Sequence, residues 1–139
     1  MEASITINRP VEEVFAFVTD VGSWTKWNEE LTHVEQVSEG PIGVGTICKG
    51  MAEVMGKMAF AAQILEYEPN QKVVQRMNIG PAKFQATWTF EPAPEGTRFT
   101  LNSRAQSEGL GRVSSSLFDG MFKKRLGANL ARLKAIMEG

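Results

Sequence analysis

The feature that most constrains the fold is a change of hydrophobic period near the last quarter of the chain. From Val34 to about Ala105, apolar residues alternate with polar ones between turn residues, whereas after Gly109 and Gly111 they recur at helical spacing. A period of two is typical of strands with one buried face, and a period near 3.6 is typical of an amphipathic helix. The pattern therefore predicts a sheet followed by one long helix.

The alternating region divides at its Gly, Pro and Asn residues into six short strands. We expect strands at about residues 34–37, 46–54, 57–67, 73–77, 83–90 and 99–105. Gly56 marks a hairpin turn, and the Pro69-Asn70 and Gly80-Pro81 pairs mark two others. Successive hairpins of this kind make an antiparallel meander.

The first thirty residues predict one more strand and two short helices. Ala3, Ile5 and Ile7 alternate with polar residues, as in a strand. Pro10 then favours a helix start, and the next apolar residues follow helical spacing until about Asp20. Residues 24–31 can form a further turn or two of helix before the second strand.

The C-terminal helix should be the longest element, at about 25 residues. Its apolar stripe consists of Val113, Leu117, Met121, Leu126, Leu130, Leu133 and Met137. Together with the seven strands and two short helices, this order predicts a single α+β domain over residues 1–139.

Composition excludes several classes of function. The 15 Lys and Arg residues against 16 Asp and Glu give a net charge of −1, which disfavours nucleic acid as a partner. Cys48 is the sole cysteine, so we expect a reducing compartment, with the cytoplasm as the default. No segment approaches the ~20 apolar residues of a membrane span, so stable membrane insertion is not expected.

Six groups of motifs occur in a recognisable order. They are INRPVEEVF at 7–15, Asp20 with Trp24 and Trp27, residues 40–46, residues 66–69, residues 96–98 and LARLK at 130–134. This order resembles the START-like or Bet v 1-like superfamily, in its SRPBCC polyketide cyclase/dehydrase branch, nearly end to end. The resemblance implies a helix-grip fold, a seven-stranded antiparallel sheet wrapped around the C-terminal helix with a cavity between them. Members include polyketide cyclases, lipid and quinone carriers and hormone receptors, so one chemistry does not follow.

The alternation predicts which side chains face this cavity. Small residues on one strand, opposite larger apolar ones, should leave room for a ligand. The predicted ligand-binding residues are Trp27, Cys48, Gly50, Ala52, Phe60, Ala62, Gln75, Met77, Phe84, Trp88, Phe99, Leu101, Leu117 and Met121. The competing interpretation is that these side chains interlock as an ordinary core.

A few polar residues are candidates for specific roles. Gln75 falls on the inward register and could fix the polar end of a ligand, or bond to neighbouring backbone instead. His33, the only histidine, fits a solvated surface position better than that of a general base. Asp119 could face the cavity, lean into solvent or pair with Lys123. No residue is assigned a catalytic role, and no metal site or cofactor is expected.

Three functions remain open. The first is binding of a small hydrophobic molecule of polyketide, lipid, quinone or isoprenoid type. The second is a polyketide aromatase/cyclase or dehydratase that orients a reactive chain. The third is an assembly factor that docks another chain through exposed Ile47 and Met51. A homodimer is compatible with all three.

Overall fold

A computed structural model describes residues 1–54, 56–105 and 115–139, the side chains of 115–122 excepted. Its elements follow the order expected from the sequence. They are β1 (Glu2–Ile7), α1 (Val11–Thr19), the 3-10 helix η1 (Val21–Ser23), α2 (Trp24–Trp27), β2 (Leu31–Gln36), β3 (Ile47–Glu53), β4 (Lys57–Glu68), β5 (Lys72–Ile79), β6 (Ala82–Ala93), β7 (Gly96–Ala105) and α3 (Ser115–Glu138).

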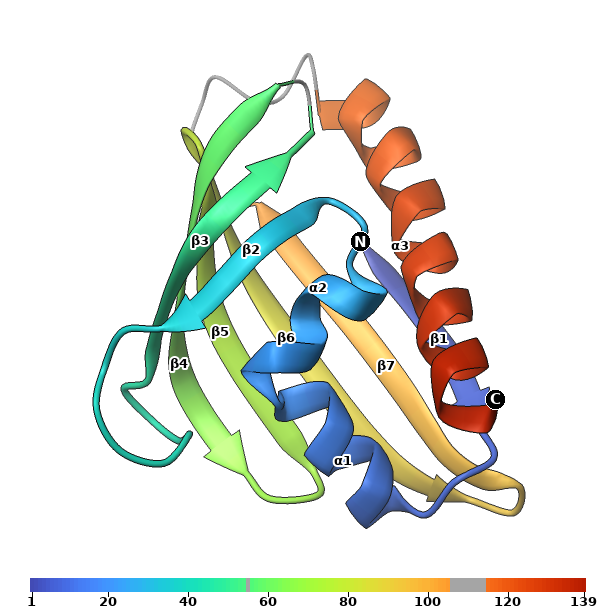
Figure 1. The fold of residues 1–139 in the computed structure, drawn as a ribbon. Helices are drawn as coiled ribbons and strands as arrows, with labels where there is room; N and C mark the ends of the chain where they lie inside the picture. The colour runs from blue at the N-terminus through green and yellow to red at the C-terminus, as the bar shows by residue number, and fades with distance from the viewer. Residues whose placement is uncertain (55, 106–114) are drawn as a thin grey trace.

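The strands form one antiparallel sheet of seven strands in the order β1-β7-β6-β5-β4-β3-β2. The meander runs from β2 to β7, and β1 joins it by pairing with β7. The curved sheet partly surrounds α3, which runs beside β1, while α1 and α2 lie in front of its lower half (Figure 1). The predicted α+β helix-grip fold is thereby confirmed.

Two irregularities in strand pairing accompany this curvature. The register shifts between Leu31 and His33 where β2 meets β3, and between Ile64 and Glu66 where β4 meets β5. Such bulges bend a strand and increase its local twist. At the β6–β7 hairpin, Gly96 has φ of +142°, and a Cβ there would lie 2.3 Å from the Ile7 carbonyl oxygen. Glycine at this position lets the hairpin approach the end of β1.

The second short helix is shorter than the sequence pattern predicts. It ends at Trp27 rather than near residue 31, because Asn28 has extended backbone and Leu31 already begins β2. Trp24 and Trp27 are both buried, and the Trp24 indole Nε1 donates to the Val18 carbonyl oxygen at 3.0 Å. This bond ties α2 to the end of α1.

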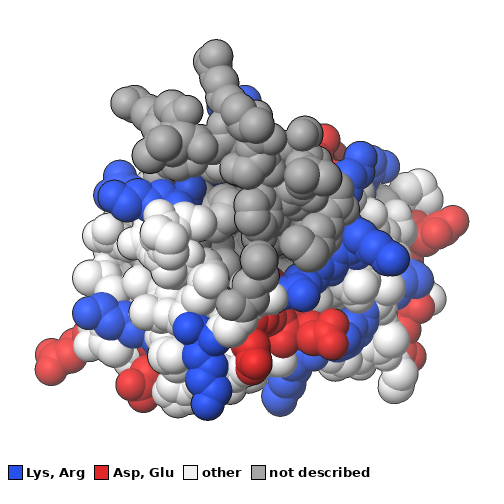
Figure 2. Space-filling view, turned by 90° about the horizontal axis from the view of Figure 1, so that it is seen from above, with Lys and Arg blue, Asp and Glu red and all other residues white. Residues whose placement is uncertain are grey.

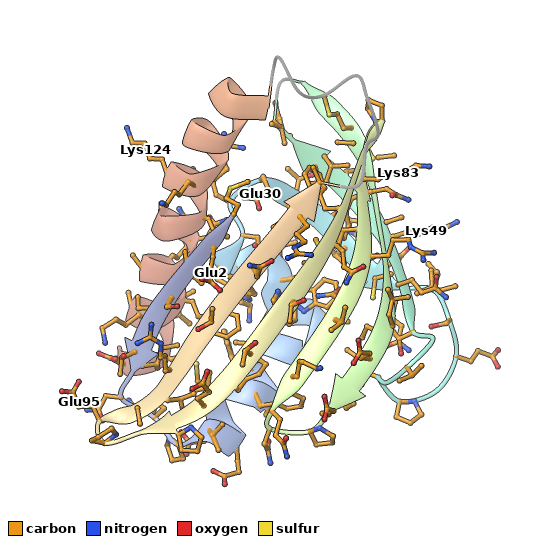
Figure 3. All side chains as sticks on the ribbon, turned by 180° about the vertical axis from the view of Figure 1, so that it is seen from behind. Glu2, Glu30, Lys49, Lys83, Glu95 and Lys124 are labelled. Atoms are coloured by element: carbon orange, nitrogen blue, oxygen red, sulfur yellow. The ribbon has the colours of Figure 1, made fainter. Side chains whose placement is uncertain are left out.

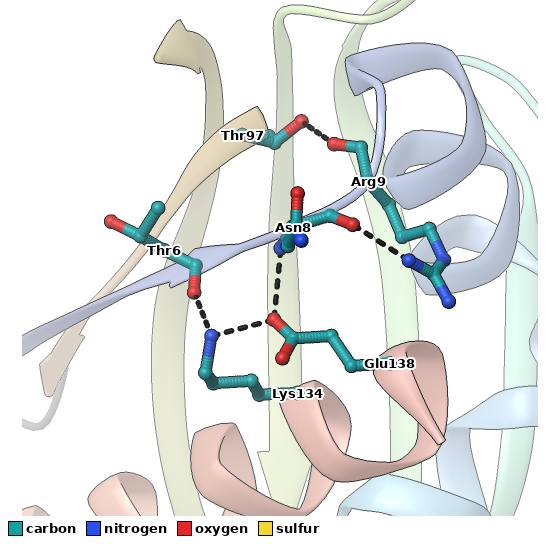
Figure 4. A network of polar contacts seen from close by, with 6 residues as sticks. All are labelled: Thr6, Asn8, Arg9, Thr97, Lys134 and Glu138. Carbon is teal, nitrogen blue, oxygen red and sulfur yellow. Dashed lines mark hydrogen bonds and ion pairs between the residues drawn. The ribbon is translucent and has the colours of Figure 1, made fainter. Parts of the chain in front are cut away.

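The described part of α3 is held at its C-terminal end by packing and by polar contacts. Leu130 and Leu133 are buried in the core. The Lys134 ammonium donates to the Thr6 carbonyl oxygen at 2.6 Å and pairs with Glu138, whose carboxylate accepts from the Asn8 amide at 2.8 Å (Figure 4). The side chains of Val113, Leu117, Asp119 and Met121 lie outside the described residues.

An aromatic cluster fills the lower part of the concave face. Phe99 is fully buried, with its ring centroid 5.0 Å from Phe90 and 6.1 Å from Trp27. Phe15 of α1 adds an edge contact to Phe90 at 4.9 Å. Edge-to-face packing at such distances is favourable beyond the area it buries. Through Phe15 and Trp27, the cluster packs α1 and α2 against the sheet.

Candidate functional site: an apolar cavity with a buried amide

The upper part of the concave face encloses a cavity of about 100 Å³. Strands β5, β6 and β7 supply one wall, and α3 with the segment from α2 to β2 supplies the other. The lining is mainly apolar and consists of Met1, Trp24, Asn28, Glu30, Leu31, Gln75, Met77, Ile79, Phe84, Ala86, Trp88, Leu101, Ser103, Arg125, Leu126 and Asn129.

Gln75 is the polar residue set deepest in this wall. It pairs in register with Ile64 on β4 and with Ala86 on β6, and Ala86 pairs with Ser103 on β7. The Gln75 side chain is fully buried, and neither its Nε2 nor its Oε1 has a hydrogen-bond partner among the described residues. A buried amide without hydrogen-bond partners costs free energy, so a molecule that offers a donor or an acceptor to Gln75 would lower that cost.

The opposite wall carries a second polar group centred on Asn129 of α3, which is 1% exposed. Its Nδ2 donates to the Glu30 carboxylate at 2.9 Å, and its Oδ1 accepts from the Glu29 backbone amide at 3.2 Å. Arg132 adds an ion pair with Glu29 at 3.4 Å. These polar contacts join α3 to the loop before β2, and the residues that make them form the rim of the cavity.

Five of the predicted ligand-binding residues lie together in the lining. They are Gln75, Met77, Phe84, Trp88 and Leu101, all on β5, β6 or β7. On these neighbouring strands the alternation continues without a bulge, so the inward register follows directly from the sequence.

Apart from Gly50, the other described candidates lie in the packed core and not among the lining residues. They are Trp27, Cys48, Ala52, Phe60, Ala62 and Phe99. Leu117 and Met121 lie outside the described side chains. None of the described lining residues comes from β3, where small side chains were expected to leave room.

Gly50 shows why the small residues of β3 leave no space. A Cβ at this position would lie 1.8 Å from the His33 carbonyl oxygen of β2. The glycine therefore accommodates the close approach of a neighbouring backbone. Ala52 pairs with Leu31 next to the bulge of β2, and both are buried.

Two other titratable candidates, His33 and Cys48, are not among the residues that line the cavity. His33 is exposed on β2, with its Nε2 3.8 Å from the Glu35 carboxylate. Cys48 is buried on β3, and desolvation by burial raises the pKa of its thiol to about 11. Within the described ranges, no cluster of His, Cys, Asp and Glu could hold a metal ion.

Sequence reasoning missed several lining residues, Asn129 and Met1 among them. Asn129 follows Leu126 by three positions and precedes Leu130, so its place on the buried stripe was a usable signal. Its contact with Glu30 joins residues 99 positions apart, which no local pattern reveals. The Met1 ammonium donates to the Ser103 carbonyl oxygen at 2.9 Å and so places the first residue at the cavity.

Comparison with protein families identifies the chain. Residues 1–138 match the family described as polyketide cyclase/dehydrase and lipid transport, and the chain belongs to this family. The expected relationship to the polyketide cyclase/dehydrase branch is confirmed. Membership supports a role in binding hydrophobic molecules or in polyketide cyclisation. No curated protein sequence matches the chain.

Solved structures show the same fold at low sequence identity. The protein TTHA0849 from Thermus thermophilus superimposes with a TM-score of 0.76 at 22% identity, covering 97% of this chain and 94% of that one. Ara h 8.0201 gives a TM-score of 0.75 at 18% identity, covering 100% of this chain and 97% of that one. The di-domain ARO/CYC protein StfQ of the steffimycin biosynthetic pathway gives 0.77 at 14%, covering 99% of this chain and 50% of that one.

Of the helices in the described ranges, none is both long and apolar enough to cross a membrane.

Proposed function

We propose that this domain binds a small hydrophobic molecule of polyketide, lipid, quinone or isoprenoid type in the cavity between the sheet and α3. The observation that carries the proposal is the buried amide of Gln75, which has no hydrogen-bond partner among the described residues and lies in a mainly apolar wall. Ligand sites commonly combine apolar walls with a few polar groups that fix orientation. Gln75 would serve as that polar group.

The size of the cavity limits how much of a ligand it can enclose. Drug-sized ligands occupy pockets of roughly 300–1,000 Å³, whereas an apolar cavity of about 150 Å³ holds benzene. At about 100 Å³, this cavity has about two-thirds of that volume, so it suits a small polar head, or one ring that extends partly toward the rim. A longer polyketide or isoprenoid would place its ring at Gln75 and extend past Glu30 and Asn129 at the rim.

Two probes of matching shape test this role of Gln75. Phenol and toluene differ by a hydroxyl in place of a methyl group, so binding to the parent should favour phenol by about fivefold to tenfold, the value of one net hydrogen bond. A Gln75→Met variant, which keeps a side chain of similar length, should lose this preference. Titrations followed by protein NMR measure both affinities.

A Ser103→Ala variant is the matched control, because Ser103 also lines the cavity and lies in the same row of the sheet as Gln75. It should keep the preference for phenol. If the parent binds neither probe, or if Gln75→Met discriminates as the parent does, Gln75 is not the ligand's anchor.

The second candidate function is that of a polyketide aromatase/cyclase, the activity named for StfQ. The observation that favours it is the carboxylate of Glu30, which lines the cavity and is held by Asn129. A positioned carboxylate can accept or deliver a proton during aldol closure. A Glu30→Gln variant should then abolish turnover of a poly-β-ketone while phenol still binds, whereas a binding protein would show no turnover to lose.

A further inference from the structure

Two residues with charged side chains, Glu30 and Arg125, are among the described residues that line the cavity. The Glu30 carboxylate accepts from the Asn129 Nδ2 at 2.9 Å. The ammonium of Met1, another lining residue, donates to the Ser103 carbonyl oxygen. Arg125 differs from both groups, because it forms no hydrogen bond or ion pair with another residue that the structure describes.

Helix α3 places Arg125 on the same wall as the polar contacts of the rim. Arg125 is half-buried, and Asn129 follows it by four positions, so the two residues lie one turn apart on the same face of the helix. Partial removal of a cation from water costs free energy unless an anion or hydrogen-bond acceptors compensate for it. An acidic group in the cavity would supply that compensation to Arg125.

The outer surface near this part of α3 does not single out a site for an anion. Seen from above, Asp and Glu side chains lie beside Lys and Arg side chains (Figure 2). Lys124, which precedes Arg125, is exposed and extends from α3 away from the sheet, whereas Glu30 lies between α3 and the sheet in the same view (Figure 3). Among the described lining residues, Arg125 is the one with a cationic side chain.

We propose that Arg125 binds a carboxylate group of the ligand. The inference rests on the proposed function and narrows it to hydrophobic acids, with a neutral polar group at one end and a carboxylate at the other. The neutral group lies at the fully buried Gln75, and the carboxylate lies at half-buried Arg125, where contact with water lowers the cost of enclosing a charge.

A carboxylate fits this position better than a phosphate does. The planar guanidinium group of arginine pairs with the two oxygens of a carboxylate through two parallel hydrogen bonds. A phosphate monoester carries a charge of about −1.5 to −2 at pH 7, so Glu30 in the same lining would repel it more strongly than a carboxylate with one charge. The charges of the lining therefore favour a monoanion.

Two probes that share the ring of phenol and differ in charge test the proposal. They are 3-(4-hydroxyphenyl)propanoate and its amide, 3-(4-hydroxyphenyl)propanamide. At pH 7 the parent should bind the acid about tenfold more tightly than the amide, the lower value for a hydrogen bond to a charged group, because Arg125 is only half-buried. Adding 0.5 M NaCl should reduce this preference and leave phenol binding unchanged, since salt screens charges.

Three variants separate Arg125 from the general charge of the helix. Arg125→Gln should bind the acid and the amide alike and should keep the affinity of the parent for phenol. Lys124→Gln is the matched control, because it makes the same charge change at the preceding, exposed residue and should keep the preference for the acid. Arg125→Lys, which keeps the charge but not the paired hydrogen bonds, should retain part of the preference. Melting curves establish that all three variants are folded.

The outcomes distinguish this inference from the proposed function. A parent that binds phenol but does not prefer the acid would overturn the role of Arg125 and leave the proposed function standing. A preference that survives in Arg125→Gln, or that falls equally in Lys124→Gln, would also overturn it. Binding of the acid that depends on Arg125 in a parent that does not bind phenol would support this inference and count against the role of Gln75. A parent that binds none of the three probes would contradict both.

Discussion

The lower and upper parts of the concave face are built from the same strands, yet one is a packed core and the other holds a cavity. Along β6 and β7, Phe90 and Phe99 fill the lower part with rings 5.0 Å apart. Farther up the same strands, Ala86 and Ser103 face each other beside Gln75. Small and polar side chains thus leave space where large apolar ones would close it.

Trp88 lies at the boundary between these two parts. Its indole packs edge to face on Trp24 and Trp27, at 5.6 Å and 5.8 Å between centroids, and it also lines the cavity. The aromatic cluster therefore forms the floor of the cavity. The proposed ligand would therefore meet a packed aromatic floor beneath an amide that has no hydrogen-bond partner among the described residues.

The largest expected effect is on the packed part. Phe99→Ala should lower the free energy of unfolding by about 3–5 kcal/mol, because it leaves a void among fully buried rings. Met77→Ala, on the half-buried wall of the existing cavity, should cost less than about 2 kcal/mol. Denaturant melts measure both, and equal losses would mean that the two parts are packed alike.

A smaller effect of opposite sign is expected at the cavity. Without ligand, Gln75→Met should raise the free energy of unfolding by about 1–3 kcal/mol, because it removes a buried amide that has no partner among the described residues. Ser103→Ala should change stability little. A loss of stability in Gln75→Met would show that the amide is satisfied in the free protein.

A third prediction concerns the reactivity of Cys48, which lies in the packed part. With its pKa raised to about 11 by burial, about one thiol in a thousand is ionised at pH 8. Its labelling by a thiol reagent should therefore be at least about 100-fold slower than that of a free cysteine, and unfolding in urea should remove the difference. Rapid labelling of the folded protein would place Cys48 at an open surface.

The order of elements could be predicted from the sequence because each element carries its own period. The inward faces of β5, β6 and β7 were predictable for the same reason, and Gln75 was found through them. The second short helix was predicted too long, since the tertiary pairing of β2 begins at Leu31. The local pattern of apolar and polar residues does not show at which residue a strand begins to pair with its neighbour.

The rest of the site depends on contacts that strand alternation does not encode. Cys48 and Ala52 of β3 are buried as expected, but the backbone of β2 approaches Gly50 and occupies the space expected beside it. The rim forms where Asn129 meets Glu30 across 99 residues of sequence.

The most direct test of the account is to observe the Gln75 side-chain amide by NMR, with its signals assigned by their loss in Gln75→Met. On addition of phenol, the account predicts a large shift of the two Nε2 protons and slower exchange with water, and toluene should produce little of either. Phenol binding that leaves the Gln75 amide signals unchanged would contradict the claim that this amide anchors the ligand.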